Sequence, residues 1–238
     1  MNVLNVAVAG GAWVTASGIG CMNGGDGFRM SDGVLPELRR ELLSSGPEQR
    51  WGRLDYFSKA GLVAASLALR DAGLSPHEVP ASTAVIASTA GGSVDVDHEY
   101  FRTVVPQSGL LASPNLFAYT LPSCMLGEIS IRYGITGPAM VVSQTTPDMM
   151  TGIVSGAKLI SYGLCERVIA GYCDTEAGIR CVETLCKPGA VFLILEKAEE
   201  KSPLALRGSE LTYNGRVLRD LTDLMGELTH DKHAELKR

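Results

Sequence analysis

Cysteine and histidine are the residue types in this chain that most readily do chemistry. The cysteines are Cys21, Cys124, Cys165, Cys173, Cys181 and Cys186, and the histidines are His77, His98, His230 and His233. No two cysteines have C-x-x-C spacing, and the histidines lie far in sequence from the cysteines at 165–186, so the converging ligands of a zinc site are not indicated. We expect no metal site, and buried, reduced thiols instead.

The segment Thr146-Pro147-Asp148 is a second candidate. Threonine is a good N-cap, proline suits the first helical position and aspartate complements the positive helix end, so the segment predicts the start of a helix. As a nucleophile, the Thr146 hydroxyl would need a neighbouring base, and none can be named. Gln144 lies two positions before Thr146. Its side chain could belong to a site at this turn, and it could equally well pair with the end of a strand. No cysteine is expected within reach of this turn.

Gly18-Ile19-Gly20 invites comparison with the dinucleotide fingerprint G-x-G-x-x-G. Asn23 stands where the third glycine should be, and no helical pattern follows. We therefore expect a glycine-rich loop and no cofactor.

The elements that must position these residues alternate between strands and helices. Apolar runs predict five buried strands, at 3–9, 83–88, 140–143, 168–170 and 191–195. The clearest helix runs from Phe57 to Ala72 and stops at Gly73. Further helices are expected at 95–105, 122–133 and 147–162. This order predicts an α/β fold with a mostly parallel five-stranded sheet covered by helices.

Composition limits the functional classes. The chain has 238 residues, a net charge of −5 and 45% apolar residues, which is typical of a globular protein with a sizeable core. The acidic balance argues against nucleic-acid binding, which needs a basic footprint. No apolar run approaches the roughly 20 residues of a membrane span. The first residues lack a basic signal-peptide region, so we expect a cytoplasmic protein.

Several motifs share one resemblance. They are DYFSK and DAGL at 55–59 and 71–74, PNLF and LP at 114–117 and 121–122, GEISI and YGITGP at 127–131 and 133–138, ISYG and IAGYCD at 160–163 and 169–174, and GAVFLILE at 189–196. Their order and spacing resemble the β-ketoacyl synthases of fatty-acid and polyketide assembly. The resemblance implies a thiolase-like half-fold, with a ketosynthase-like N-terminal domain over 1–208 and a charged, helical C-terminal extension over 209–238.

The resemblance also implies a position for the nucleophile. Ketosynthases of this kind use a cysteine at the N-terminus of the helix after the third strand, where the helix dipole and backbone N–H groups assist it. Aligning Gly137-Pro138 and Tyr162-Gly163 without a gap places that position on Thr146. The family's histidines and lysine belong to a second half that this sequence does not match. We therefore expect no catalytic residue and no independent activity.

Other site residues follow from the same resemblance. The acyl tunnel would be lined by Phe117, Cys124, Met125 and Met149, although Cys124 is better explained by packing than as a nucleophile. The strand Met140, Val141, Val142 and Ser143 would pair across a dimer axis. An acidic acyl carrier protein could contact Arg39, Arg40, Arg50 and Arg53, which could also form an ordinary solvated face.

The helix expected at 147–162 gives a separate reason to expect a partner. Its apolar side, with Met149, Met150 and Ile153, would be covered by the second half of a complete fold. Left bare, it would expose more apolar surface than soluble monomers usually tolerate.

Three functional hypotheses remain open. The first is a catalytically silent subunit, similar to a chain-length factor, which partners a full-length ketosynthase and shapes its tunnel; such factors have often lost the cysteine to glutamine, and here Gln144 is displaced from that position. The second is a self-associating module, as a homodimer, that binds an acyl chain or lipid. The third is residual thioester decarboxylation or hydrolysis.

Overall fold

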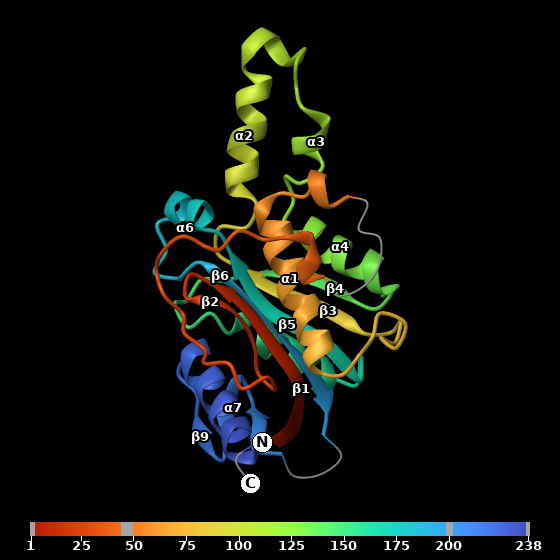
Figure 1. The fold of residues 1–238 in the computed structure, drawn as a ribbon, viewed down its shortest axis with the longest axis vertical. Coiled ribbons are helices and arrows are strands. Elements are labelled where there is room, and N and C mark those ends of the chain that lie inside the picture. Colours follow the sequence, from red (N-terminus) through yellow and green to blue (C-terminus); the bar gives the residue numbers. More distant parts are fainter. Residues whose placement is uncertain (1–2, 44–49, 199–201, 237–238) are drawn as a thin grey trace.

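A sheet with helices on both faces runs through the molecule (Figure 1). The computed structural model describes residues 3–43, 50–198 and 202–236. Within them the strands are β1 (Val3–Thr15), β2 (Gly18–Cys21), β3 (Ala84–Thr89), β4 (Ala139–Ser143), β5 (Arg167–Asp174), β6 (Gly189–Lys197), β7 (Leu204–Arg207), β8 (Glu210–Tyr213) and β9 (Arg216–Val217). Their spatial order is β4-β3-β5-β6-β1-β7-β8-β9, and β2 pairs with β1.

The five predicted strands form the centre of this sheet. Strand β3 is parallel to β4 and β5, whereas β6 is antiparallel to β5 and to β1. Four of the five central strands therefore run in one direction, which confirms the mostly parallel α/β fold. Strands β2, β7, β8 and β9 extend the sheet beyond the prediction.

Strand β1 is longer than its apolar run suggested. The predicted end of the strand at residue 9 is wrong, because the strand passes through a bulge between Val8 and Gly10 and continues to Thr15. It then turns into β2, so the expected glycine-rich loop is a hairpin. Gly10 permits this path, since a Cβ atom there would lie 2.4 Å from the backbone nitrogen of Ala72.

The helices expected at 57–72, 95–105 and 122–133 are present within one residue of those limits, whereas the helix expected at 147–162 starts later. The helices are α1 (Tyr56–Asp71), α2 (Val94–Val104), α3 (Pro114–Phe117), α4 (Ser123–Tyr133), α5 (Thr151–Ser161), α6 (Glu176–Val182) and α7 (Leu221–Leu236), with short 3-10 turns η1 (Arg40–Leu42), η2 (Trp51–Arg53) and η3 (Pro106–Gly109). The Asp55 carboxylate caps α1 by accepting from Ser58 N, and Gly73 ends it at a φ of +75°.

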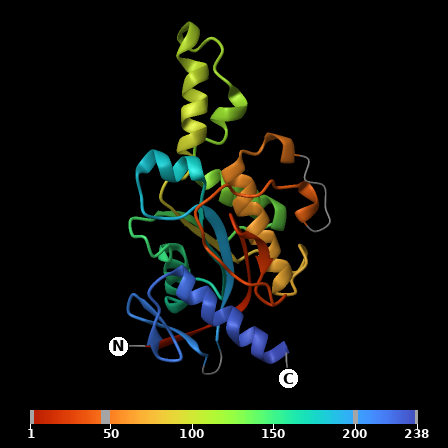
Figure 2. The ribbon, with the colours of Figure 1, turned by 60° about the vertical axis from the view of Figure 1, so that its left-hand side comes forward.

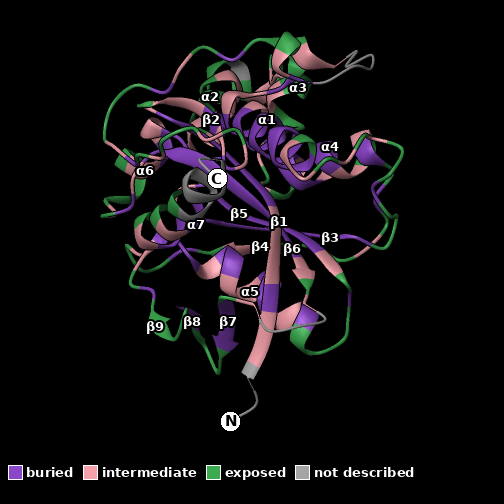
Figure 3. Ribbon diagram, turned by 60° about the horizontal axis from the view of Figure 1, so that its bottom comes forward, coloured by how far each residue is buried: buried purple, intermediate pink, exposed green. Residues whose placement is uncertain are grey.

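Two apolar cores lie on the two faces of the sheet. Helices α1 and α4 supply the first core, and α5 and α7 supply the second. Figure 3 shows the central strands buried between these layers, and Figure 2 shows α7 lying across its side of the molecule. The result is a three-layer α/β/α arrangement.

The C-terminal segment covers the face of α5 that was expected to be bare. Met149, Met150 and Ile153 are each at most 7% exposed, and they share a core with the α7 residues Leu221 and Leu224. The prediction of an uncovered apolar face on this helix is therefore wrong. The predicted boundary after residue 208 falls in the turn between β7 and β8, which pair in one sheet.

An arm formed by α2, η3 and α3 projects from one end of the molecule (Figure 1). Tyr100 on α2 packs against Phe117 on α3, with ring centroids 5.4 Å apart. The arm bears large apolar side chains that are more than half exposed: Phe101, Val105, Leu110, Leu111, Phe117 and the adjoining Leu121.

Candidate functional site: a closed elbow before helix α5

The loop from Gln144 to Met150 joins β4 to α5 and contains the predicted nucleophile position. The helix begins at Thr151, four residues later than the sequence indicated, and Met149 has a left-handed φ of 58°. Thr146 therefore lies outside the helix and does not cap it. We call the loop 144–150 the elbow.

Side chains of the elbow occupy the backbone donors at the start of α5. Asp148 Oδ1 accepts from Met150 N at 2.8 Å, and Gln144 Oε1 accepts from Thr151 N at 3.2 Å. These two contacts replace the cap that the sequence assigned to Thr146. An oxyanion hole needs such N–H groups free and directed at the substrate, and here protein oxygens already accept from them.

Thr146 is held in the same network. Its hydroxyl donates to Asp148 Oδ2 at 2.6 Å, and Gln144 Nε2 donates to its carbonyl oxygen at 2.7 Å. Gln144 is buried, at 4% exposed. The elbow thus brings Gln144 and Thr146 together. The glutamine has a structural role, because it caps α5 and also holds the Thr146 backbone by a hydrogen bond.

A cysteine does lie beside the elbow, contrary to expectation. Cys186 Sγ donates to the carbonyl oxygen of Thr146 at 3.5 Å. Its thiol is 4% exposed, and burial raises its pKa, with the carboxylates of Asp174 and Asp148 adding to the effect. Cys186 is therefore held as a neutral thiol and not as a thiolate nucleophile. Its separation of 40 residues from Thr146 hid this contact from sequence reasoning.

The four predicted tunnel residues lie in different parts of the fold. Met125 is fully buried against Gly61 in the core of α1 and α4, whereas Met149 belongs to the core on the other face of the sheet. Phe117 lies on the arm and is 61% exposed. Cys124 donates to Ala118 O at 3.0 Å, and burial raises its pKa, so it packs as a neutral thiol. Their shared tunnel stays a prediction.

The predicted interface strand lies at the edge of the sheet. Strand β4 is bonded to β3 on one side and is the last strand in the spatial order on the other. Met140 and Ser143 are exposed, and Val141 and Val142 are half-buried.

The arginines predicted to meet a carrier protein divide into two groups. Arg50 lies 3.3 Å from the buried carboxylate of Glu128, which also accepts from Tyr119 Oη at 3.2 Å. Arg39, Arg40 and Arg53 are exposed. Arg50 is therefore partly exposed and pairs with a carboxylate of its own chain, and the other three are exposed.

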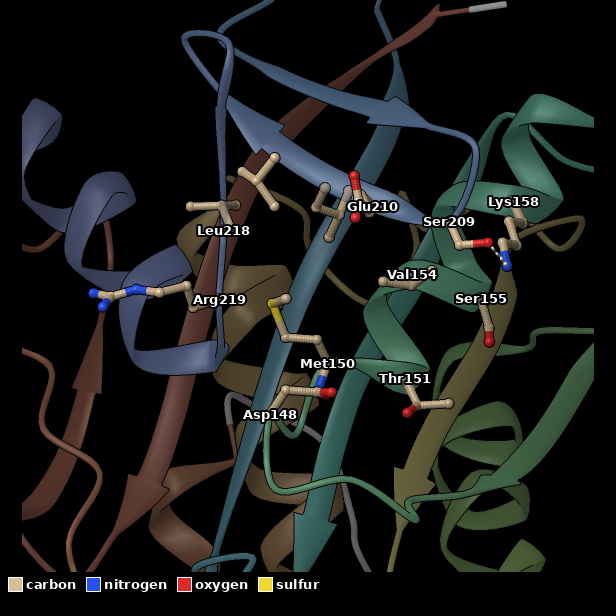
Figure 4. Close-up of a pocket in the computed structure, with 12 residues that line it drawn as sticks. Asp148, Met150, Thr151, Val154, Ser155, Lys158, Ser209, Glu210, Leu218 and Arg219 are labelled. Carbon is tan, nitrogen blue, oxygen red and sulfur yellow. Dashed lines mark hydrogen bonds between the residues drawn. The ribbon is translucent and has the colours of Figure 1, made fainter. Parts of the chain in front are cut away.

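A pocket of about 320 Å³ adjoins the elbow between α5 and the C-terminal strands (Figure 4). Asp148, Met150 and Thr151 line it from the helix side, and Glu210 and Leu218 line it from the other. Lys158 Nζ reaches Ser209 Oγ at 3.5 Å, and Arg219 is held by Asp223 at 2.9 Å. Both signs of charge are present, so the pocket favours no single class of ion.

Within the described ranges, no group of three or more His, Cys, Asp or Glu side chains is placed to hold a metal ion. In the same ranges, no helix is both long and apolar enough to cross a bilayer.

Comparison with known proteins gives one consistent result. The family described as "Beta-ketoacyl synthase, N-terminal domain" matches residues 40–189. A Streptomyces rimosus protein named as an oxytetracycline polyketide β-ketoacyl synthase is 33% identical over 186 residues, covering 75% of this chain and 42% of that protein. The chain spans less than half the length of the curated relatives it matches.

Solved structures show the same fold. A ketosynthase in complex with its chain length factor from Xenorhabdus doucetiae matches with a TM-score of 0.60 at 16% identity, over 83% of this chain and 80% of that chain. A type II polyketide acyl-carrier protein in complex with its ketosynthase matches with a TM-score of 0.63 at 18% identity, over 83% and 64%. The coverage makes the matched Xenorhabdus chain similar in length to this one. The resemblance inferred from the motifs is confirmed, as is the thiolase-like fold.

Proposed function

Because the chain belongs to the β-ketoacyl synthase family, we propose that it is a catalytically silent subunit, similar to a chain-length factor, which partners a complete β-ketoacyl-acyl carrier protein synthase and shapes its acyl tunnel. The closed elbow is the observation that carries this proposal. The position aligned with the nucleophile holds Thr146, and the N–H groups of Met150 and Thr151 are occupied by Asp148 and Gln144.

Nucleophilic acyl transfer needs an activated nucleophile and a donor pair for the oxyanion. The Thr146 hydroxyl donates to the Asp148 carboxylate, which also accepts from Met150 N and is a weak base toward an alcohol, and Cys186 is a buried neutral thiol. Both requirements of ketosynthase chemistry are thus unmet at this elbow. The subunit would contribute shape and contacts, while its partner contributes the cysteine.

The edge strand supports the partner. The outer side of β4 offers backbone groups to a pairing strand, and its sequence Ala-Met-Val-Val-Ser contains no charge or proline to block such pairing. The matched Xenorhabdus chain comes from a ketosynthase and chain length factor complex, which supports a heterodimer over a homodimer. The exposed Arg39, Arg40 and Arg53 offer positive charge to an acidic carrier protein.

The test is a pull-down of the tagged chain at its native expression level, with bound proteins identified by mass spectrometry. A stoichiometric, cysteine-bearing ketosynthase is the expected result. Recovery of the chain alone, as a homodimer carrying an extractable lipid, would instead establish the self-associating module.

A variant pair locates the interface. Met140→Lys places a charge on the β4 edge and should weaken the complex at least tenfold by light scattering or native mass spectrometry. The matched control is Val182→Lys, since Val182 at the end of α6 has the same 42% exposure as Met140. If both variants bind the ketosynthase as tightly as the parent does, β4 is not the interface.

A further inference from the structure

Away from the elbow, we propose that Cys181 and His98 form a reactive site, a surface thiol–imidazole pair that accepts an acyl group from a thioester. The choice of thioesters as the substrate class rests on the proposed function. The site itself rests on the geometry of α2 and α6.

The two side chains come from different helices and meet at the surface. Cys181 Sγ lies 3.7 Å from His98 Nδ1, and both residues are exposed. Because sulfur is large, this distance is within hydrogen-bond reach of a thiol, and an imidazole so placed can take the thiol proton and leave a nucleophilic thiolate.

The meeting of α2 and α6 is fixed by contacts at their bases. Thr175, which caps α6, donates from its hydroxyl to Asp95 Oδ2 on α2 at 3.1 Å. Gly91, just before α2, lies so close to α6 that a Cβ atom there would be 2.4 Å from the carbonyl carbon of Gly178. These contacts fix the two helices relative to each other, and the helices in turn hold Cys181 beside His98.

Cys181 also differs from the other cysteines of the chain. Cys165, Cys173 and Cys186 are buried, and Cys21 and Cys124 are half-buried, whereas Cys181 is exposed. Burial raises the pKa of each of those five thiols. An electrophile in solution should therefore select Cys181.

The proposed reaction is a balanced exchange of thiols. His98 Nδ1 takes the Cys181 proton, and Sγ attacks the thioester carbonyl carbon. The bond from that carbon to the donor sulfur then breaks, and the imidazolium returns the proton to the departing thiolate. The products are acyl-Cys181 and one free thiol, with no oxidant or reductant needed.

The experiment exposes the intact chain to the acetyl thioester of N-acetylcysteamine and follows acetylation by intact mass and peptide mapping. We expect one acetyl group, on Cys181, and none on Cys181→Ser. His98→Asn should slow acetylation at least tenfold. His77→Asn, which changes an exposed histidine outside this site, should leave the rate unchanged.

Three results would overturn the proposal: no acetylation, acetylation first at Cys21 or Cys124, or an unchanged rate in His98→Asn. Circular dichroism of each variant checks that its fold is intact. This test and the pull-down can fail separately. A ketosynthase complex without acetylation of Cys181 would refute only the site proposed here. Acetylation of Cys181 without a ketosynthase complex would refute only the proposal of a silent subunit.

Discussion

Asp174 shows how a buried residue at the end of a strand can organise a loop. It is fully buried at the end of β5, and its carboxylate accepts hydrogen bonds from Thr89 Oγ1 and from the backbone nitrogens of Ala90, Gly91 and Gly92. These donors come from the last residue of β3 and from the segment that follows it. One side chain thus fixes the loop from which α2 and the arm depart.

We expect Asp174→Ala to destabilise the fold by about 3 kcal/mol at neutral pH, because several buried donors lose their acceptor. Burial raises the pKa of this carboxyl above its value in the unfolded chain. Its stabilising contribution should therefore be largest near pH 4 and decline as the pH rises through the raised pKa. Urea unfolding at pH 4.5 and pH 7.5 measures this difference, with the exposed Glu99→Ala as control. A penalty that grows with pH would contradict the expected sign.

Thr146→Cys restores the thiol without restoring the site. The new Sγ would lie beside the Asp148 carboxylate, which disfavours a thiolate, and the helix donors would remain occupied. We expect no acylation of residue 146 by a small thioester, measured by peptide mapping in a Cys181→Ser background. Stoichiometric acylation there would show that the elbow is catalytically competent.

The sequence predicted which residues fill the elbow but not how they interact. Thr146 was identified as a helix start from its residue type and as the nucleophile position from the family resemblance, and Gln144 as its neighbour, whereas Cys186 was missed. Its contact with Thr146 depends on the return of the chain from α6 to β6. Local patterns carry no information about such distant contacts.

Among the secondary-structure elements, those with local signals were predicted well. Helix α1 has its own cap at Asp55 and its own stop at Gly73, so its position could be read from neighbouring residues. Helix α5 starts later than predicted. Its first N–H group, at Thr151, donates to the side chain of Gln144, seven residues earlier, and such a contact is not part of the usual capping pattern in sequence. Strands β2, β7, β8 and β9 are short, and pairing with neighbours defines them more than apolar pattern does.

Gly10 and Gly226 are expected to respond in opposite ways to replacement by alanine, because only Gly10 is packed against backbone. Gly10→Ala should destabilise the chain by at least 2 kcal/mol, because its Cβ atom would strike the backbone of α1. Gly226→Ala, inside α7 with no atom within 4 Å of the new Cβ, should stabilise it by about 0.5–1 kcal/mol. Chemical denaturation compares the two variants. Equal effects would mean that α1 does not approach β1 as described.

At the scale of the whole molecule, the C-terminal segment is part of the core. Leu224 is fully buried on α7 and packs in the same cluster as α5 and the central strands. Leu224→Ala should cost about 2–5 kcal/mol and leave a single unfolding transition. Thr222→Ala, exposed on the same helix, is the matched control. A separate early transition in Leu224→Ala would show that α7 unfolds independently.

The open edge of β4 has a consequence for the life of the protein in the cell. If a ketosynthase pairs with this edge as we propose, and binds only the folded chain, it would stabilise the chain by mass action, by about 2.7 kcal/mol when present at a hundred times the dissociation constant. That is a large fraction of the stability of a typical domain. The abundance of this subunit would then follow the supply of its partner, because unaccompanied copies would unfold and be degraded more often.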